Sequence, residues 1–390
     1  MSDSQSRKPH MMRKSGAENV LVLYWGRLCG GASYTLEVTR ALQTERKGKV
    51  FGSFAIQNEL HERMESLDIP TLWISTYSSK LSFILSSILV PLKLGRLLVF
   101  IKRNGITTIY CTMTHYWMPF VIVAAKVLEI RLILTCHDAL PHPGEAGAVR
   151  AVIMKWEMRH AHSIVVLSRH VEGKIREFTG PTKAIHVVPL GLLLHLDVDE
   201  PMAPASHILP RRLLFFGRIL DYKGLGLLLG AYRIMKEGAY PYLTLEIAGN
   251  GELSPYRESL VDLADVVFNN RWISEEEIPA IFRRNDILVV PYIEASQSGP
   301  VATALAFGIP SVVTPVGGLT EQIIDGKTGV IASAVSVDGI AQAISHLISS
   351  PDLYRECATR AKAYAKEHLA WSVIGVQINA IINQDSHGEF

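Results

Sequence analysis

The sequence predicts an α/β protein in which two doubly wound domains face a central cleft. Short apolar runs typical of buried strands recur in both halves of the chain, and segments with helical patterns separate most of them. This alternation is typical of a parallel sheet with helices on both faces. It stops once, in a Pro-containing stretch at residues 196–211, and then begins again. A chain of 390 residues is long enough for two such domains, each with its own core.

These breaks divide the chain into five parts. Residues 1–17 are polar, and we expect them to form a disordered tail. The first domain is predicted at residues 18–195 and the second at residues 212–370, with 196–211 as the linker between them. The apolar pattern that follows predicts a final helix within residues 371–390.

Each half contains a series of apolar runs that we interpret as strands. In the first half they are Asn19–Trp25, Val50–Ile56, Thr71–Ile74, Thr107–Cys111, Arg131–Cys136 and Ser163–Leu167. In the second half they are Leu213–Phe216, Leu243–Ala248, Val266–Phe268, Ile287–Val290, Ser311–Thr314 and Val330–Ile331. Doubly wound folds bind their ligands at the carboxyl ends of the strands. The loops that follow these runs are therefore the candidate binding loops.

The composition of the chain argues against several classes of function. A formal net charge of +2 argues against a partner bound through bulk electrostatics, and we expect no nucleic acid. The four cysteines lie far apart without a C-x-x-C pair, which argues against a zinc site and indicates a reducing compartment. The chain begins with polar residues and lacks the apolar core of a secretion signal there. We expect a cytoplasmic protein with neither a metal nor a cofactor.

The loop after the strand at Leu213–Phe216 carries two cations. Gly217 ends the strand, and Arg218 and Lys223 follow five residues apart in the sequence Gly-Arg-Ile-Leu-Asp-Tyr-Lys-Gly. Arginine presents a planar fork to phosphate oxygens and lysine a compact point charge. The loop therefore indicates a diphosphate site. The alternative interpretation is two solvated cations in an ordinary loop between a strand and a helix.

A second loop predicts the start of a buried helix. Ser298 is a good N-cap, and Pro300 falls in the first helical turn, where its missing N–H costs nothing. The helix is predicted over Val301–Phe307, and Gly308 ends it. Its first turn would present the N–H groups of Ser298 and Gly299 to an anion. The alternative interpretation is a well-capped core helix without a ligand.

Three loops of the first half hold polar groups at the ends of strands. Gly31 lies at a strand-to-helix junction, which fits either close approach of a ligand or a tight turn. His137 and Asp138 follow the strand that ends at Cys136, where we expect them to face the cleft, and His142 lies in the same loop as either a site residue or a structural one. A further histidine and a tyrosine follow the strand at 107–111. These two residues are His115 and Tyr116. In one interpretation His115 contacts the acceptor and Tyr116 offers a ring on which a sugar stacks. In the other they cap a helix and pack in the core.

The most apolar segment is Leu81–Ile101. Its length approaches that of a membrane-spanning helix, but it contains Lys93 and Arg96, and a charge at the bilayer centre is costly. We therefore exclude a transmembrane span. Two interpretations remain, a helix pair buried in the first domain or an amphipathic segment, Leu81–Arg103, that contacts anionic lipid at the inner leaflet.

The second half resembles a known family through a series of motifs in a fixed order. These are Gly217–Gly224, Ile247–Glu252, Arg271–Ile278, Asp286–Tyr292, Ala306–Pro310 and Val316–Ile323. The series resembles the carboxyl-terminal half of a family-4 retaining glycosyltransferase of the GT-B fold and extends from about Leu213 to Ser333. The first half matches more loosely. The resemblance implies two Rossmann-like domains and a C-terminal helix that crosses back to the first.

The resemblance also implies roles for particular residues. Arg218 and Lys223 would bind the diphosphate of a nucleotide-sugar donor, and His137 would contact the donor sugar. These three residues are also the catalytic candidates, together with Glu294. Further donor-binding residues would be Gly31, Gly249, Trp272, Ile273, Glu294, Ser296, Gln297, Ser298, Gly299 and Thr303. Acceptor-binding residues would be His115, Tyr116, Asp138 and His142.

One departure from the family pattern concerns two glutamates separated by seven residues. The second falls at Ala302 or Thr303, and neither is acidic. The chain resembles instead a subgroup with Ser/Thr-Gln-Ser-Gly in this region. The ribose contact of that glutamate would pass to the Thr303 hydroxyl, and Glu294 is the candidate for the carboxylate that contacts the sugar and assists catalysis.

The activity implied is metal-independent, retaining transfer of a hexose from a UDP- or GDP-linked donor. The acceptor would be a saccharide, lipid-linked at the inner leaflet, in the assembly of a bacterial-type surface polysaccharide. One alternative is a non-catalytic subunit that binds sugar nucleotides for a partner transferase. A second is a nicotinamide-dependent dehydrogenase, although the first strand lacks the G-x-G-x-x-G that such an enzyme requires.

Overall fold

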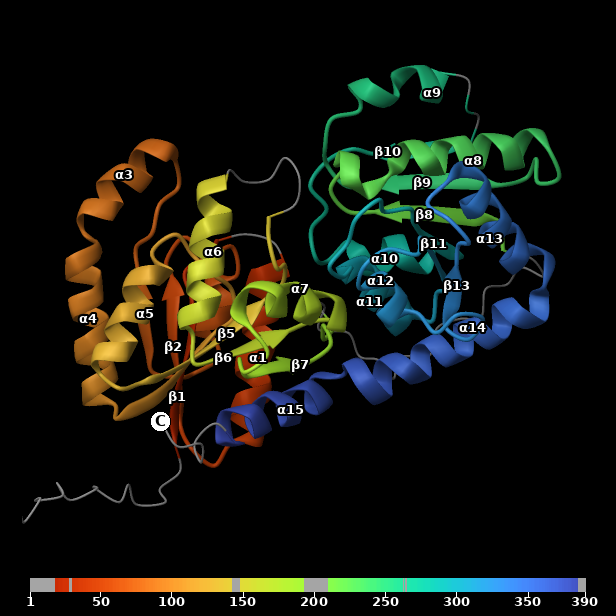
Figure 1. The fold of residues 1–390 in the computed structure, drawn as a ribbon. Helices are drawn as coiled ribbons and strands as arrows, with labels where there is room; N and C mark the ends of the chain where they lie inside the picture. The colour runs from red at the N-terminus through yellow and green to blue at the C-terminus, as the bar shows by residue number, and fades with distance from the viewer. Residues whose placement is uncertain are drawn as a thin grey trace, which may run out of the picture.

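A computed structural model describes residues 18–27, 30–141, 148–192, 210–261, 263 and 265–384. Three of the predictions lie outside these residues, namely the disordered tail at 1–17, the site role of His142 and most of the linker at 196–211. The described chain forms two parallel sheets, each covered by helices on both faces, in a two-domain Rossmann-like arrangement (Figure 1). The predicted fold class is confirmed.

The first sheet has seven parallel strands in the order β3-β2-β1-β4-β5-β6-β7. Their bounds are β1 Asn19–Tyr24, β2 Val50–Ala55, β3 Thr71–Ile74, β4 Ile106–Cys111, β5 Arg131–Cys136, β6 Ser163–Val166 and β7 Ile185–Val187. The helices are α1 Gly30–Glu45, α2 His61–Glu65, α3 Lys80–Ile88, α4 Val90–Arg103, α5 Met118–Val127, α6 Ala148–His160 and α7 Arg169–Thr179. Apolar side chains of α4 to α7 pack on one face of the sheet, and those of α1 and α2 pack on the other.

The second sheet has six parallel strands in the order β10-β9-β8-β11-β12-β13. Their bounds are β8 Arg212–Phe216, β9 Thr244–Ala248, β10 Val266–Asn269, β11 Ile287–Val290, β12 Ser311–Val313 and β13 Gly329–Ile331. The helices are α8 Leu225–Glu237, α9 Arg257–Val261, α10 Ile278–Arg283, α11 Gly299–Phe307, α12 Leu319–Gln322, α13 Val337–Ser349 and α14 Pro351–Tyr364. Side chains of α8 and α13 cover one face, and those of α10 and α11 cover the other.

All of the predicted strands are present within a residue or two of the expected bounds. The sequence did not predict β7, because this strand is only three residues long and half-buried, and His186 interrupts its apolar pattern. In both sheets the strand order reverses beside the first strand, between β1 and β4 and between β8 and β11. Ligands of doubly wound folds bind at such switch points, at the carboxyl ends of the strands.

The chain returns to the first domain at its end. Figure 1 shows α14 running beneath the second domain and α15, Trp371–Gln384, continuing beneath the first. The face of α15 that contacts α1 contains Gly375, where an added Cβ would lie 2.7 Å from the Cβ of Ala41. At the start of α15 the Trp371 indole N–H donates to the Leu192 carbonyl at 2.6 Å. This helix is therefore packed closely on the first domain.

The segment Leu81–Ile101 is not the buried helix pair that was one of its two interpretations. It forms α3 and α4, and Leu81, Ile88 and Leu92 are 65–70% exposed. In the described chain no single helix is long and apolar enough to cross a membrane, and α3 and α4 qualify only as a pair bent by 58°. Together with α5 they form what we call the apolar surface. Its exposed members are Leu81, Ile84, Leu85, Ile88, Leu89, Leu92, Val99, Phe120, Val123 and Val127.

The contact between α1 and α15 gives a test of the fold. We expect Gly375→Val to lower the free energy of unfolding by about 1–3 kcal/mol, because the added atoms overlap Ala41. The matched control is Gly95→Val in α4, where an added Cβ meets nothing within 4 Å. Thermal or urea unfolding measures both variants. Equal stability of the two variants would contradict the packing described for α15.

Candidate functional site

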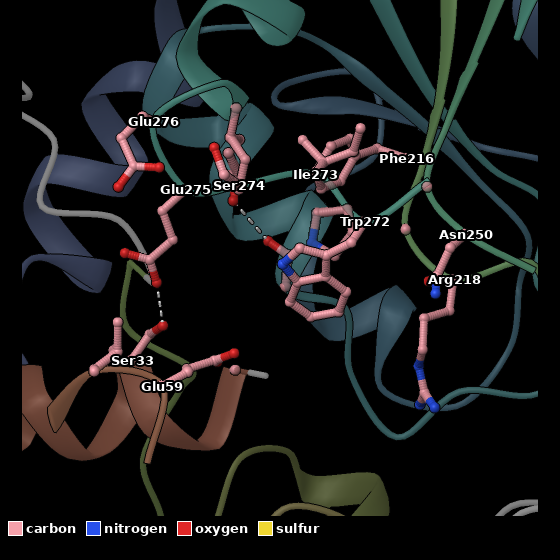
Figure 2. Close-up of a pocket in the computed structure, with 18 of the residues that line it drawn as sticks. Ser33, Glu59, Phe216, Arg218, Asn250, Trp272, Ile273, Ser274, Glu275 and Glu276 are labelled. Carbon is pink, nitrogen blue, oxygen red and sulfur yellow. Dashed lines mark hydrogen bonds between the residues drawn. The ribbon is translucent and has the colours of Figure 1, made fainter. Parts of the chain in front are cut away.

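A cavity of about 950 Å³ lies between the two domains. The first domain lines it with the starts of α1 and α2 and with Asp138, which follows β5. The second domain lines it with the loops that follow β8, β9, β10 and β11. Figure 2 shows Ser33 and Glu59 on the side of the first domain, with Trp272 and Arg218 opposite them. The cavity therefore lies where the carboxyl ends of both sheets meet.

The loop after β8 is held tightly against the end of β11. Gly224 has a φ of +66°, and a Cβ there would lie 2.0 Å from the carbonyl oxygen of Pro291. The Ile293 N–H donates to the Tyr222 carbonyl at 2.7 Å. Only glycine allows the two segments to approach so closely in this conformation. The cations of this loop are therefore placed by backbone contacts with the neighbouring strand.

Lys223 is oriented by an aromatic side chain. Its Nζ donates to the hydroxyl of Tyr292 at 2.9 Å and lies 4.5 Å from the centroid of the same ring. A Cβ at Gly217 would lie 3.5 Å from this Nζ and 3.9 Å from Cγ of Pro300 in the first turn of α11. The absence of a side chain at Gly217 thus leaves open the space between the ammonium and the helix. Arg218, which is exposed, lines the cavity beside them.

The start of α11 has the predicted cap but not all of the predicted donors. The Ser298 side chain accepts from the N–H of Val301, and Gly308 ends the helix with a φ of +64°. The Ser298 N–H, however, donates to Oε1 of Gln322 at 2.7 Å, and Gln322 donates back to the Ser298 carbonyl at 3.1 Å. The prediction that this N–H faces an anion is therefore wrong, because a side chain of α12 already occupies it. Ser298 and Gly299 both line the cavity, and the anion-binding role of Gly299 stays a prediction.

Other donor-binding candidates of the second domain also line the cavity. Trp272 is 52% exposed, and in Figure 2 its indole stands between the side chains of Glu275 and Arg218. Gly249, Ile273 and Gln297 share the lining. The Arg271 guanidinium donates to the Trp272 carbonyl at 3.0 Å and to the Glu277 carboxylate, and its hydrogen bonds lower the pKa of Glu277 to about 2. An exposed indole thus stands on an ordered loop at the cavity.

The residue that replaces the family's second glutamate is buried in the helix. Thr303 is 7% exposed, lines the cavity, and donates through its hydroxyl to the Gly299 carbonyl at 3.1 Å. The amide oxygen of Gln297 is buried and has no hydrogen-bond partner among the described residues. This part of the cavity therefore offers neutral polar groups in place of a carboxylate.

Contacts between the domains hold the cavity in a closed form. Glu275 accepts a hydrogen bond from the Ser33 hydroxyl at 2.5 Å, drawn in Figure 2, and forms an ion pair with Arg63. The Glu321 carboxylate accepts the N–H groups of Arg169 and His170 at 2.7 and 2.8 Å, at the start of α7. Each contact joins a residue of one domain to the other. The two half-sites therefore face each other at fixed separation in this structure.

Several predicted site residues lie outside the cavity lining. Gly31 is covered by Met113 and Tyr24, which a Cβ there would meet at 2.9 and 3.0 Å. His137 donates through Nε2 to the Thr112 carbonyl at 3.0 Å and does not line the cavity. Its neighbour Asp138 does line the cavity.

Two candidates of the second domain also lie outside the lining. Glu294 extends toward Lys174 of the first domain, with 3.8 Å between the charged atoms. Ser296 is buried, and its carbonyl accepts from the Ser168 hydroxyl at 2.9 Å. Both residues belong to the contacts between the domains, so the structure gives no support to their direct contact with a sugar.

The acceptor candidates His115 and Tyr116 lie elsewhere on the first domain. His115 is 6% exposed and packs against Trp25, and burial lowers its pKa to about 3. Tyr116 is 48% exposed but does not line the cavity. Their position after β4 correctly indicated the edge of the sheet. It did not indicate that the side chains after β4 pack within the first domain, against Tyr77, Phe83 and Arg150.

The sequence analysis assigned no site role to some of the residues that line the cavity. They are Glu59 to Arg63 of the first domain and Phe216, Tyr222, Asn250 and Ser274 to Glu276 of the second. Several of them directly follow predicted strands, which was the available signal. Glu275 lies in the motif Arg271–Ile278, but its contacts could not be predicted, because its partners Ser33 and Arg63 are more than 200 residues away.

A bound metal would need several ligating side chains close together. Within the described chain no group of three or more His, Cys, Asp or Glu side chains is arranged to bind one. The Asp197-Val198-Asp199 sequence lies in the linker, outside the described residues. The described cavity offers a loop with two cations, an exposed indole and neutral polar groups.

Each half of the chain matches the model of a known protein family. Residues 30–191 match the model of a glycosyl transferase 4-like domain, and residues 210–350 match that of the glycosyl transferases group 1. D-inositol 3-phosphate glycosyltransferase of Arthrobacter sp. is 30% identical over 304 residues, which cover 70% of this chain and 72% of that protein. Glycogen synthase of Mycobacterium tuberculosis is 26% identical over 294 residues, covering 70% and 69%.

Solved structures agree in fold. The structure of Anabaena Alr3699/HepE in complex with UDP superposes with a TM-score of 0.74 at 16% identity, covering 94% of this chain and 100% of that one. Sucrose-phosphate synthase from Thermosynechococcus elongatus superposes with a TM-score of 0.70 at 17% identity, covering 94% and 98%.

The contact between Lys223 and Tyr292 gives a test of the anion site. We expect Tyr292→Phe to weaken the binding of inorganic pyrophosphate about two- to tenfold, because the ammonium loses a hydrogen bond that orients it. Isothermal titration calorimetry measures the change. Tyr240→Phe is the matched control, since its hydroxyl contacts Ser345 away from the cavity. Unchanged binding in Tyr292→Phe would show that this contact does not shape the site.

Proposed function

The chain belongs to the glycosyl transferases of group 1 and has the GT-B fold, and from this premise we propose that it transfers a hexose with retention of configuration and without a metal. The donor is a nucleotide-diphosphate sugar and the acceptor a saccharide. The observation that carries the proposal is the convergence of Arg218, Lys223 and the first turn of α11 on one cavity. Such a site offers positive charge where a diphosphate would depart.

The proposed role of these groups is to stabilise the leaving group. Negative charge develops on the diphosphate as the glycosidic bond breaks, and preorganised donors lower the energy of that state. Arg218 supplies a planar fork and Lys223 a point charge. The first turn of α11 contributes the positive end of a helix dipole at Gly299. In this proposal the cations perform the function that a divalent metal has in other transferases.

The transfer step needs no base from the protein. The bond between the anomeric carbon and the donor phosphate oxygen breaks, and a bond to the acceptor oxygen forms on the same face. The acceptor hydroxyl proton passes to the departing phosphate oxygen. Two of the predicted catalytic residues, His137 and Glu294, lie outside the cavity lining, which is compatible with this scheme.

The donor is proposed to carry UDP or GDP. One structural neighbour binds UDP, and a mycobacterial relative, 25% identical over 268 residues, is described as GDP-mannose-dependent. The exposed Trp272 and its neighbour Ile273 offer an apolar surface for the base. The neutral Thr303 is the proposed partner of the ribose.

The acceptor is proposed to be lipid-linked and to be used at the cytoplasmic face of a membrane, in surface-polysaccharide assembly. The apolar surface of α3, α4 and α5 supports this, because large exposed apolar patches mark interaction sites. None of these three helices contains Asp or Glu, whereas Arg96, Lys102 and Lys126 are exposed on them. Apolar side chains flanked by cations match the chemistry of an anionic bilayer surface.

The diphosphate site gives the test of catalysis. We expect Lys223→Ala and Arg218→Ala each to lower turnover about a hundredfold or more, because each removes a donor that stabilises developing charge. The assay is release of the nucleotide from UDP-glucose or GDP-mannose, with Lys327→Ala, an exposed lysine outside the cavity, as control. Near-full turnover in both site variants would contradict the proposal. A thermal shift with either donor, without any turnover, would favour a non-catalytic binding subunit.

The membrane contact has a separate test. We expect the double variant Leu85→Asp/Leu92→Asp to lose most of its co-flotation with anionic liposomes, because a charge at an apolar interface is costly. Val376→Asp is the control, since Val376 is similarly exposed on α15. Liposomes of zwitterionic lipid should bind the wild-type protein more weakly. If the wild-type protein does not float with anionic liposomes, the physical basis for a membrane acceptor is lost.

A further inference from the structure

A cluster of aromatic and cationic side chains on the first domain lies outside the cavity. We call it the aromatic-cation cluster, and its members are Arg27, Tyr77, His115, Tyr116 and Arg150. The Arg27 guanidinium lies 5.1 Å from the centre of the Tyr77 ring, and that of Arg150 lies 5.3 Å from the Tyr116 ring. The His115 ring is 5.6 Å from Tyr77 and 6.4 Å from Tyr116 between centroids. The two cation–ring pairs therefore meet at one histidine.

The cluster has a positive electrostatic environment. Besides burial, the charges of Arg150, Lys93 and Arg27 lower the pKa of His115, which stays neutral near pH 7. Arg150 forms an ion pair with the buried Glu157 at 3.2 Å, which offsets one of these charges. Among the described residues neither Arg27 nor Lys93 forms an ion pair with an acidic side chain, and each lies against an aromatic ring. An anion placed here would be attracted.

The cluster also contains a hydrogen-bond donor without an acceptor. Nδ1 of His115 accepts the backbone N–H of Trp117 at 3.3 Å, so in the neutral ring the proton is on Nε2. This Nε2 is buried and has no hydrogen-bond partner among the described residues. A buried donor without an acceptor carries a desolvation cost that a bound anion would relieve. Tyr116 is 48% exposed, which leaves the cluster accessible from solvent.

The cluster lies between the cavity and the apolar surface. The carbonyl of Arg27 accepts the N–H of Glu59 at 2.9 Å, and Glu59 lines the cavity. On the other side, Tyr77 contacts Phe83 of α3 with 4.9 Å between ring centroids. A molecule that reaches from the cavity to the apolar surface would therefore pass the aromatic-cation cluster.

We propose that this cluster binds the phosphate that joins the saccharide of the acceptor to its lipid. The proposal rests on the proposed function and names the chemistry of the acceptor. The guanidinium groups of Arg27 and Arg150 supply charged donors for phosphate oxygens, and the hydroxyl groups of Tyr77 and Tyr116 supply neutral ones. The saccharide would then extend into the cavity, and the lipid would lie on the apolar surface.

The test measures the binding of octyl phosphate, inorganic phosphate and octanol to the full chain by calorimetry, with UDP present in excess to fill the diphosphate site. We expect octyl phosphate to bind the wild-type protein and Arg27→Gln to weaken it at least tenfold. Arg355→Gln, at an exposed arginine of α14, is the matched control and should leave binding unchanged. Tyr116→Phe keeps the ring and should weaken binding about two- to tenfold by removing a donor. Thermal melting confirms that each variant is folded.

The outcomes separate the possible ligands. Unchanged affinity for octyl phosphate in both Arg27→Gln and Tyr116→Phe would overturn the proposal. Inorganic phosphate that binds as tightly as octyl phosphate would overturn the assignment to a lipid-linked phosphate, and so would octanol that binds equally well. The same titration without UDP, in an Arg218→Ala background, keeps the result readable if UDP does not bind. Failure of UDP binding would count against the proposed function and leave the phosphate site to be judged by itself.

Discussion

The close approach of two backbone segments in the second domain is the constraint on which the candidate site depends. The loop after β8 lies against the end of β11, and the space between them is too small for any side chain at Gly224. A second glycine, Gly249, has a φ of +140° and would meet the carbonyl of Gly217 at 2.1 Å if it carried a Cβ. Because these contacts are between backbones, the positions of Arg218 and Lys223 are fixed by the fold of the sheet.

The same organisation explains how two separate half-sites form one cavity. Each sheet reverses its strand order beside its first strand, and the loops there point toward the other domain. Glu275 and Glu321 join the domains through hydrogen bonds to Ser33 and to the start of α7. These contacts between the domains are polar, and polar interfaces between domains commonly permit relative motion.

Much of the fold could be predicted from the sequence because local signals coincide with it. The strands are nearly continuous apolar runs, and both Ser298 and Gly308 stand where local chemistry places the ends of a helix. The loop at Arg218 and Lys223 could be located because cations directly follow a buried strand. In each of these cases the cause lies within a few residues of the effect.

The remaining features depend on residues that are distant in sequence. The engagement of the Ser298 N–H by Gln322 follows from the packing of α12 against the start of α11. His115 is buried because the rings of Trp25 and Tyr77, 90 and 38 residues earlier in the chain, pack against it. Glu294 was a catalytic candidate because it is a carboxylate in the expected region of the chain. In the structure it pairs with Lys174 of the other domain, and this position does not support a catalytic role. None of these contacts leaves a trace in local composition.

The measurement that tests the central claim most directly is a crystal structure of the protein with UDP bound. The account predicts that the β-phosphate lies within hydrogen-bond distance, about 2.7–3.2 Å, of Lys223 Nζ and of the Gly299 N–H, with the guanidinium of Arg218 on the same diphosphate. A diphosphate bound instead to the first domain, near Gly30 and Asp138, with Lys223 still held only by Tyr292, would contradict it.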